Sequence, residues 1–186
     1  MTDDTRLLAA LAVIQVRGGI GERSLSDAVA HADRFVELIP EGTCSLIDLG
    51  SGGGLPALVI AWRRPDAMVT MVERRATRAD LLRRAVISLD LGERTRVLNQ
   101  DVSEVCSTSS HAFDVVTARS FGEVAITTRF VDGLLAPNGV GLISEPPVDR
   151  SQLWASVLGQ YSNLTDSGTY QGIRRLDRRK DPSRFT

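Results

Sequence analysis

Residues 45–54 read SLIDLGSGGG, a short apolar run that stops in a cluster of glycines. The part from Ser45 to Leu49 has the length and apolar content of a buried strand, and the glycines form the loop after it. Helical spacing follows from about Leu55 to Trp62. A strand, a glycine-rich turn and a helix in this order predict the first unit of a parallel sheet, whose ligands bind at the carboxyl ends of the strands.

The same alternation of strands and helices continues along the chain. Thr77, with Asp80 three residues later, predicts a capping box at the start of one of the helices. The expected strands are 45–49, 68–72, 96–99, 113–117 and 140–143, and the expected helices are 55–62, 77–91 and 121–135, with a turn at 137–139. This order predicts an α/β fold with a Rossmann-like, mostly parallel sheet and helices on both faces.

The N-terminal part has helical spacing. Residues 1–40 read as two helices separated by Gly18–Gly21, the second capped by Ser26 and ended by Pro40. We therefore expect a short helical extension at 1–40 and the main domain at 41–186.

The C-terminal part completes the expected sheet. It predicts a helix around Trp154 and a hairpin of 161–164 with 170–176, which would add antiparallel strands. The polar tail after Leu176 is expected to fray.

Composition places the chain among ordinary globular proteins. Of its 186 residues 42% are hydrophobic and 24% are charged, and the formal net charge of −1 gives no general attraction to nucleic acid or membranes. No apolar run approaches the ~18 residues of a membrane-spanning helix. The cysteines, Cys44 and Cys106, lack the spacing of a metal site or a disulfide framework. We expect a reduced, cytoplasmic protein with no membrane and no metal.

The spacing of the glycines distinguishes between kinds of nucleotide-binding loop. A dinucleotide loop has the pattern G-x-G-x-x-G, but its third glycine position, counted from Gly50, is Leu55. No Gly-Lys-Ser/Thr follows, which excludes a P-loop. The pattern present is D-x-G-x-G-x-G at 48–54, and it resembles motif I of the class I S-adenosylmethionine (SAM) methyltransferases. The alternative is a glycine-rich turn without a ligand, which would be costly in backbone entropy.

Two acids after later strands fit the same cofactor. Glu73 ends the second expected strand, where an acid accepts hydrogen bonds from ribose hydroxyls; the alternative is a surface glutamate paired with Arg74 or Arg75. The resemblance implies that Asp101 receives the adenine amine while the backbone of Val102 meets a ring nitrogen; the alternative is a helix N-cap. The residues expected to bind SAM are Asp48, Gly50, Ser51, Gly52, Gly54, Leu55, Glu73, Asp101 and Val102.

Further segments make the resemblance more specific. They are GSGGGLPAL at 50–58, RPD at 64–66, the helix through 81–91, FDVVTARSF at 113–121 and LLAPNG at 134–139. In order and spacing they resemble the RsmG family, also called glucose-inhibited division protein B, over roughly residues 26–145. The resemblance implies a SAM-dependent enzyme that methylates N7 of a guanosine in 16S ribosomal RNA, with ribosomal RNA or the small ribosomal subunit as partner.

The implied chemistry needs few catalytic groups. Guanine N7 carries a free lone pair, so methyl transfer needs no general base, and in-line positioning alone can contribute ~7–11 kcal/mol. The segment after the fourth strand supplies Arg119 and Ser120, which we expect on the acceptor side, with Arg119 holding a phosphate or the guanine edge. The alternative for Arg119 is a salt bridge to Glu123 or Asp114.

The chain departs from the RsmG pattern at two places. His31 is present in the second helix, but Arg34 and Phe35 stand where the family has an Asp-Ser pair. After the fifth strand, Ser144 and Glu145 replace a Lys-Gly pair and put a negative charge near the expected RNA. Two alternatives therefore stay open: a SAM-dependent methyltransferase for a different acceptor, or a catalytically degenerate SAM-binding protein associated with the ribosome.

Two basic groups are candidates for RNA contact. The first comprises Arg74, Arg75, Arg78, Arg83 and Arg84, and the second comprises Arg174, Arg175, Arg178, Arg179 and Lys180. The alternative for the first is a solvated helix face, and for the second a soluble chain end. RNA bound by either group would be released by salt.

Overall fold

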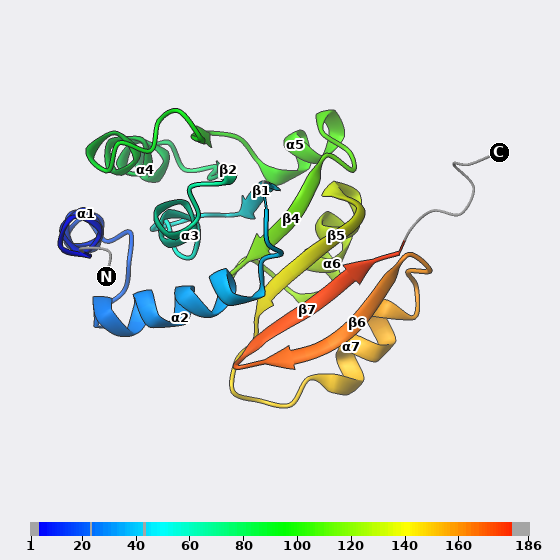
Figure 1. The fold of residues 1–186 in the computed structure, drawn as a ribbon. Helices are drawn as coiled ribbons and strands as arrows, with labels where there is room; N and C mark the ends of the chain where they lie inside the picture. The colour runs from blue at the N-terminus through cyan, green and yellow to red at the C-terminus, as the bar shows by residue number, and fades with distance from the viewer. Residues whose placement is uncertain (1–3, 23, 43, 180–186) are drawn as a thin grey trace.

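A computed structural model describes residues 4–22, 24–42 and 44–179. Its centre is a seven-stranded sheet with strand order β3-β2-β1-β4-β5-β7-β6 (Figure 1). The strands are β1 Cys44–Leu49, β2 Ala67–Val72, β3 Thr95–Leu98, β4 Phe113–Ala118, β5 Leu135–Ser144, β6 Leu164–Tyr170 and β7 Ile173–Arg178. Strands β1 to β5 pair in parallel, and β7 runs antiparallel to both of its neighbours. The predicted α/β fold with a mostly parallel sheet is confirmed.

Helices cover both faces of the sheet. They are α1 Thr5–Val16, α2 Leu25–Leu38, α3 Ala57–Arg63, α4 Ala76–Ser88, α5 Val102–Thr108, α6 Val124–Leu134 and α7 Ser151–Leu158. Buried side chains of α1 to α4 share one hydrophobic cluster with Leu46, whereas those of α5, α6 and α7 share another with Ile47. Successive residues of a strand point to opposite faces, so the continuous apolar run in β1 feeds two cores.

The strand order reverses between β1 and β4. At the carboxyl ends of these two strands, Leu49 pairs with Ala118. The segments that follow, 50–56 and 119–123, therefore begin side by side at the switch point, where open α/β sheets bind their ligands.

The N-terminal helices share the core of the sheet domain. Leu7 of α1 and Phe35 of α2 are fully buried in the same cluster as Leu58 of α3. Arg63, at the end of α3, forms an ion pair with Asp33 of α2 at 3.0 Å. The boundary at residue 40 stays a prediction, and this packing fixes the position of α2 against the sheet.

The predicted cap of α2 is wrong by two residues. The N-cap is Ser24, whose Oγ accepts a hydrogen bond from the backbone N–H of Asp27 at 3.5 Å. Ser26 lies inside the helix, with its Oγ 2.6 Å from the Oγ of Ser24. The helix ends at Leu38, just before Pro40, as expected from the missing N–H of proline.

The predicted capping box of α4 is also wrong. The helix begins at Ala76, and its N-cap residue, Arg75, makes no side-chain cap. Thr77 is therefore inside the first turn, and Asp80 pairs with Arg83 at 2.7 Å on the helix surface. A capping pattern in the sequence does not by itself determine the residue at which the helix begins, because the preceding strand and loop also set that position.

The predicted turn at 137–139 lies inside β5 rather than before it. Asn138 has a φ of +65°, and the register between β4 and β5 shifts between Phe113 and Val115. An irregularity in the strand pair thus accommodates the turn residues without ending the strand.

The predicted hairpin exists with shifted limits. Its first strand is β6, Leu164–Tyr170, and residues 161–163 precede that strand. The second strand continues past Leu176 to Arg178, which pairs with Asp132 of α6 at 2.8 Å, so the predicted fraying does not begin there. The remainder of the predicted frayed tail, 180–186, lies outside the described residues.

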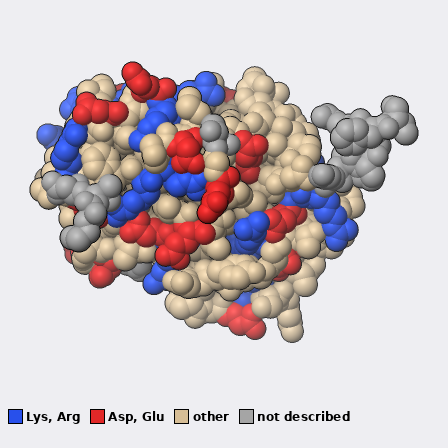
Figure 2. Space-filling model, in the orientation of Figure 1, with Lys and Arg blue, Asp and Glu red and all other residues tan. Residues whose placement is uncertain are grey.

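The face of the molecule in Figure 2 has no large patch of a single charge among the described residues. Basic and acidic side chains are interspersed there (Figure 2). Among the described helices, none combines the length and the apolar character that crossing a membrane requires.

Candidate functional site

The glycine loop after β1 uses its three alternate glycines in different ways. Gly50, Gly52 and Gly54 all have positive φ, between +55° and +86°. A Cβ on Gly50 would lie 2.8 Å from the ring of Phe121, and a Cβ on Gly54 would collide with Leu58. A Cβ on Gly52 would have no neighbour closer than 3.7 Å. Two glycines thus permit close packing, and the middle one has open space beside it.

Glu73, at the end of β2, is held by the backbone of two segments. Its Oε2 accepts a hydrogen bond from the N–H of Gly52 at 2.9 Å, and its Oε1 accepts one from the N–H of Arg75 at 2.8 Å. The residue is only 5% exposed. Asn99, directly after β3, donates to the carbonyl oxygen of Glu73 at 3.0 Å. The alternative, a surface glutamate paired with an arginine side chain, is wrong.

Asp101 caps helix α5. Its Oδ1 accepts hydrogen bonds from the backbone N–H of Ser103 at 2.9 Å and from its Oγ at 2.7 Å. The Ser103 hydroxyl bond is the largest of the influences that lower the pKa of Asp101. The N-cap alternative is therefore what the structure shows, and the same residue also borders a hollow.

That hollow, which we call the Glu73 hollow, has a volume of about 500 Å³ and lies at the carboxyl ends of β1, β2 and β3. Among the predicted cofactor residues, its lining includes Gly50, Glu73, Asp101 and Val102. Arginines and aromatic rings complete it: Arg74, Arg75, Arg78, Arg129, Phe121 and Phe130.

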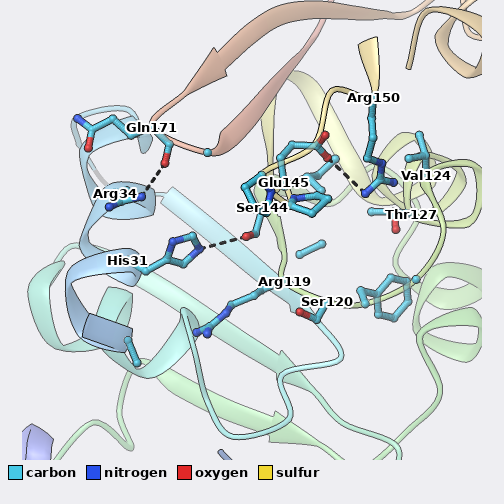
Figure 3. A pocket seen from close by; sticks show the side chains of 18 of the residues that line it. His31, Arg34, Arg119, Ser120, Val124, Thr127, Ser144, Glu145, Arg150 and Gln171 are labelled. Carbon is cyan, nitrogen blue, oxygen red and sulfur yellow. Dashed lines mark hydrogen bonds and ion pairs between the residues drawn. The ribbon is translucent and has the colours of Figure 1, made fainter. Parts of the chain in front are cut away.

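A second, larger hollow of about 1030 Å³, the His31 hollow, lies beyond β4 (Figure 3). Helix α2 forms one wall and is tied to the sheet across it. Nε2 of His31 lies 3.1 Å from Oγ of Ser144 at the end of β5, and Arg34 donates to the carbonyl oxygen of Gln171 at 2.9 Å. Arg119 points into the space between these walls (Figure 3).

The two hollows meet at Ser120 and Phe121, which line both of them. Ser120 has a φ of +53°, a conformation that costs a non-glycine residue roughly 1 kcal/mol or more. The ring of Phe121 packs edge-on against Phe130, with centroids 5.8 Å apart. The segment after β4 is therefore a shared wall, and a group in one hollow lies next to a group in the other.

The remaining predicted cofactor residues line neither hollow and lie in or next to the glycine loop: Asp48, Ser51, Gly52, Gly54 and Leu55. Asp48 is 1% exposed and accepts a 2.6 Å hydrogen bond from Oγ1 of Thr117. Burial raises the pKa of Asp48 to about 6, against hydrogen bonds from Thr117 and Ser51 and the charge of Arg119. Ser51 is buried, and its Oγ donates to the carbonyl oxygen of Asp48 at 3.3 Å. Leu55 is buried in the core with Gly54 packed beside it.

A family model described as rRNA small subunit methyltransferase G matches residues 11–146. The chain belongs to this family. The family that the sequence motifs predicted is thereby confirmed.

The rRNA small subunit methyltransferase G of Salinispora tropica is 38% identical over 136 residues, which are 67% of this chain and 54% of that protein. The chain thus spans about half the length of the relative it matches. Two solved structures share the fold. A methyltransferase from Geobacter sulfurreducens has a TM-score of 0.65 at 14% identity, covering 97% of this chain and 91% of its own. The cofactor-bound Rv0187 from MTB has a TM-score of 0.74 at 15% identity, covering 96% and 92%.

The rRNA small subunit methyltransferase G match ends at residue 146, just after one of the two departures from the family pattern. The side chain of Glu145 is 7% exposed and accepts a hydrogen bond from Nε1 of Trp154 at 2.9 Å. Arg150 and Arg174 each lie 4.0 Å from its carboxylate. Glu145 thus lies in the lining of the His31 hollow, as a negative charge near the expected acceptor, but its carboxylate is mostly buried and has two arginines nearby. Repulsion of an RNA phosphate there stays a prediction.

The two basic groups that the sequence offered for RNA contact differ in this member of the methyltransferase G family. Arg74, Arg75 and Arg78 line the Glu73 hollow, whereas Arg83 and Arg84 line neither hollow. The C-terminal group is largely structural: Arg174 pairs with Asp166, Arg175 with Asp177, Arg178 with Asp132, and Arg179 bonds Thr165. Lys180 lies outside the described residues.

Sequence reasoning missed several residues of this site. Phe121, Phe130 and Arg129 close the Glu73 hollow from α6 and the segment before it. Only the ARSF segment carried a signal for Phe121; nothing in the sequence distinguished Arg129 from a solvated helix residue. The Asp114 alternative for Arg119 is wrong, because Asp114 lies at the opposite end of β4 and accepts hydrogen bonds from Ser45. Within the described residues, no His, Cys, Asp and Glu side chains group as metal ligands.

Proposed function

We propose that the chain is a methyltransferase that moves the methyl group of SAM to N7 of a guanosine in 16S ribosomal RNA. The carrying observation is the pair of hollows that meet at Ser120 and Phe121. One has the groups that suit a nucleoside and the other has room for an acceptor base. Membership of the methyltransferase G family supports the choice of RNA as acceptor.

The residues of the Glu73 hollow fit the cofactor. Glu73 is a buried carboxylate whose two oxygens suit a vicinal diol, and each has a further lone pair beyond its backbone bond. Asp101 and the backbone of Val102 border the same space for an adenine edge. When bound, SAM supplies an electrophilic methyl group on a positively charged sulfur. The protein has to place the acceptor nitrogen in line with that methyl group.

The residues of the His31 hollow would do this placing. Arg119 offers a planar fork of donors for a phosphate or for the O6 and N7 edge of guanine. Because N7 carries a free lone pair, no proton has to be removed before attack. Ser120 borders both hollows and would keep the base next to the cofactor.

The test combines binding and product analysis. Calorimetry should show binding of SAM and of its demethylated product, S-adenosylhomocysteine. Small-subunit RNA from a strain lacking the gene should gain a borohydride–aniline cleavage site after incubation with the protein and SAM, since N7-methylguanosine is the cleaved base. Cofactor binding without any methylated RNA would favour a different acceptor or a degenerate SAM-binding protein. Absence of cofactor binding would overturn the proposal.

A further inference from the structure

The Glu73 hollow carries more positive charge than its proposed cofactor can use. Four arginines line it: Arg74, Arg75, Arg78 and Arg129. Two carboxylates line it, Glu73 and Asp101. Arg74, Arg75 and Arg129 are exposed and Arg78 is half-buried, so their guanidinium groups are accessible at the edge of the hollow. We call these four residues the arginine rim.

The rim lacks the ion pairs that several other arginines have. Arg63, Arg64 and Arg178, for example, each bond a carboxylate within 3.0 Å. Across the described ranges, the salt bridges include none from the rim, and the guanidinium of Arg129 instead lies 4.7 Å from the ring centre of Phe130. The two carboxylates can balance at most two of the four positive charges of the rim, and they also accept hydrogen bonds from backbone N–H groups and from Ser103.

The proposed cofactor does not balance this charge. SAM carries a sulfonium, an ammonium and a carboxylate, so its net charge is positive and the rim repels it. The rim therefore suits a second, anionic ligand at the mouth of the hollow. Arginine forks bind phosphate oxygens in pairs, and a run of such contacts is how proteins hold a nucleic-acid backbone.

The His31 hollow has a different charge. Three carboxylates line it, from Glu22, Asp27 and Glu145, against three arginines, Arg34, Arg119 and Arg150. A charge-balanced space suits a neutral base, and a positive rim suits the phosphates attached to it. Since Ser120 and Phe121 border both hollows, a base in one places its backbone close to the other.

We propose, building on the function above, that the phosphodiester backbone of the acceptor RNA docks on the arginine rim and covers the cofactor hollow. The order of binding follows from this geometry. The cofactor has to enter first, and bound RNA retains it, so a positively charged rim serves both to hold RNA and to prevent loss of the methyl donor before transfer.

The experiment measures release of labelled S-adenosylhomocysteine from the full chain, chased with unlabelled compound, with and without a 16S RNA transcript. S-adenosylhomocysteine has no methyl group, so turnover does not interfere. We expect RNA to slow release by about tenfold at low salt and to lose this effect at about 0.5 M salt. The triple variant Arg74→Gln, Arg78→Gln, Arg129→Gln should bring the ratio of the two rates close to one. The matched control, Arg83→Gln with Arg84→Gln on the same helix, should keep the wild-type ratio.

Release unchanged by RNA in the wild-type protein would overturn the proposal, as would slowing that survives in the triple variant. Equal slowing by inorganic phosphate alone would show a site for free phosphate and would also overturn it. Methylation of the same RNA is assayed in parallel. Slowed release without methylation supports the rim while the proposed reaction fails, and methylation without slowed release overturns the rim alone.

Discussion

The backbone N–H of Gly52 donates a 2.9 Å hydrogen bond to Oε2 of Glu73, which fastens the glycine loop after β1 to the end of β2. The other oxygen of this carboxylate accepts a hydrogen bond from the N–H of Arg75, the N-cap residue of α4. One buried acid therefore fixes the backbone on both sides of the proposed nucleoside site. The shape of this site and its affinity for a ribose depend on the same side chain.

Glu73→Ala should weaken SAM binding by about 1–3 kcal/mol, the range for losing a charged hydrogen-bond partner. The loss combines the ribose contact with a looser glycine loop. Calorimetry with S-adenosylhomocysteine measures it, and Glu104→Ala on the exposed side of α5 is the control. Wild-type affinity in Glu73→Ala would remove this carboxylate from the cofactor site.

Gly52→Val should abolish SAM binding while the chain still folds. The side chain would enter open space, with no atom closer than 3.7 Å to its Cβ, and would fill the region that the cofactor needs. The φ of +55° adds a strain of roughly 1–2 kcal/mol, which thermal denaturation would show as a modest loss. Retained affinity would mean that the loop serves structure alone.

Gly54→Ala, in contrast to Gly52→Val, should lower the stability of the fold. A Cβ there meets Leu58 and lies 3.0 Å from Leu82 at a φ of +86°, so we expect a loss of about 1–3 kcal/mol in the free energy of unfolding. Urea denaturation measures this loss, with Gly52→Ala as the matched variant in open space. Equal losses in the two variants would contradict the different uses assigned to these glycines.

Arg119→Ala should lower the rate of methyl transfer and leave SAM affinity intact. A charged hydrogen bond to the acceptor is worth about 1.5–3 kcal/mol, so the rate should fall by roughly 10- to 150-fold. Single-turnover methylation and calorimetry separate the two effects. A weaker SAM affinity with an unchanged rate would place Arg119 on the cofactor side instead.

Asp48 should make stability depend on pH. Burial raises its pKa to about 6 from 3.8, so the folded state binds the proton more tightly than the unfolded chain does. Its contribution is therefore fully present below about pH 4 and is lost as the pH rises to about 6, with a fall of up to roughly 3 kcal/mol.

Asp48→Asn should remove that part of the pH dependence, because an amide at this position does not ionise and still accepts the hydrogen bond from Thr117. Urea denaturation of both proteins at several pH values between 4 and 7 measures the difference in slope. The exposed Asp114→Asn at the start of β4 is the control. Parallel curves for wild type and Asp48→Asn would show that the buried carboxyl does not titrate in this window.

The sequence by itself determined the sheet and predicted the role of the glycine loop. Continuous apolar runs of four or five residues, most of them followed by a helical period, have few other solutions than a parallel sheet with two covered faces. The spacing of Gly50, Gly52 and Gly54, with an acid at the end of the next strand, predicted a site for the nucleoside of SAM. These are properties of short segments, and short segments are what a sequence pattern reports.

The tertiary structure decided which residues border the site and what their charges meet. The sequence shows Glu145 only as a negative charge. In the folded chain its carboxylate lies next to Trp154, Arg150 and Arg174, and no local pattern indicated these neighbours. Arg129 joins Arg74 only because α6 borders the same hollow as the segment after β2. Burial and pairing depend on neighbours from other elements, so the charge presented to a ligand follows from packing and not from the local pattern.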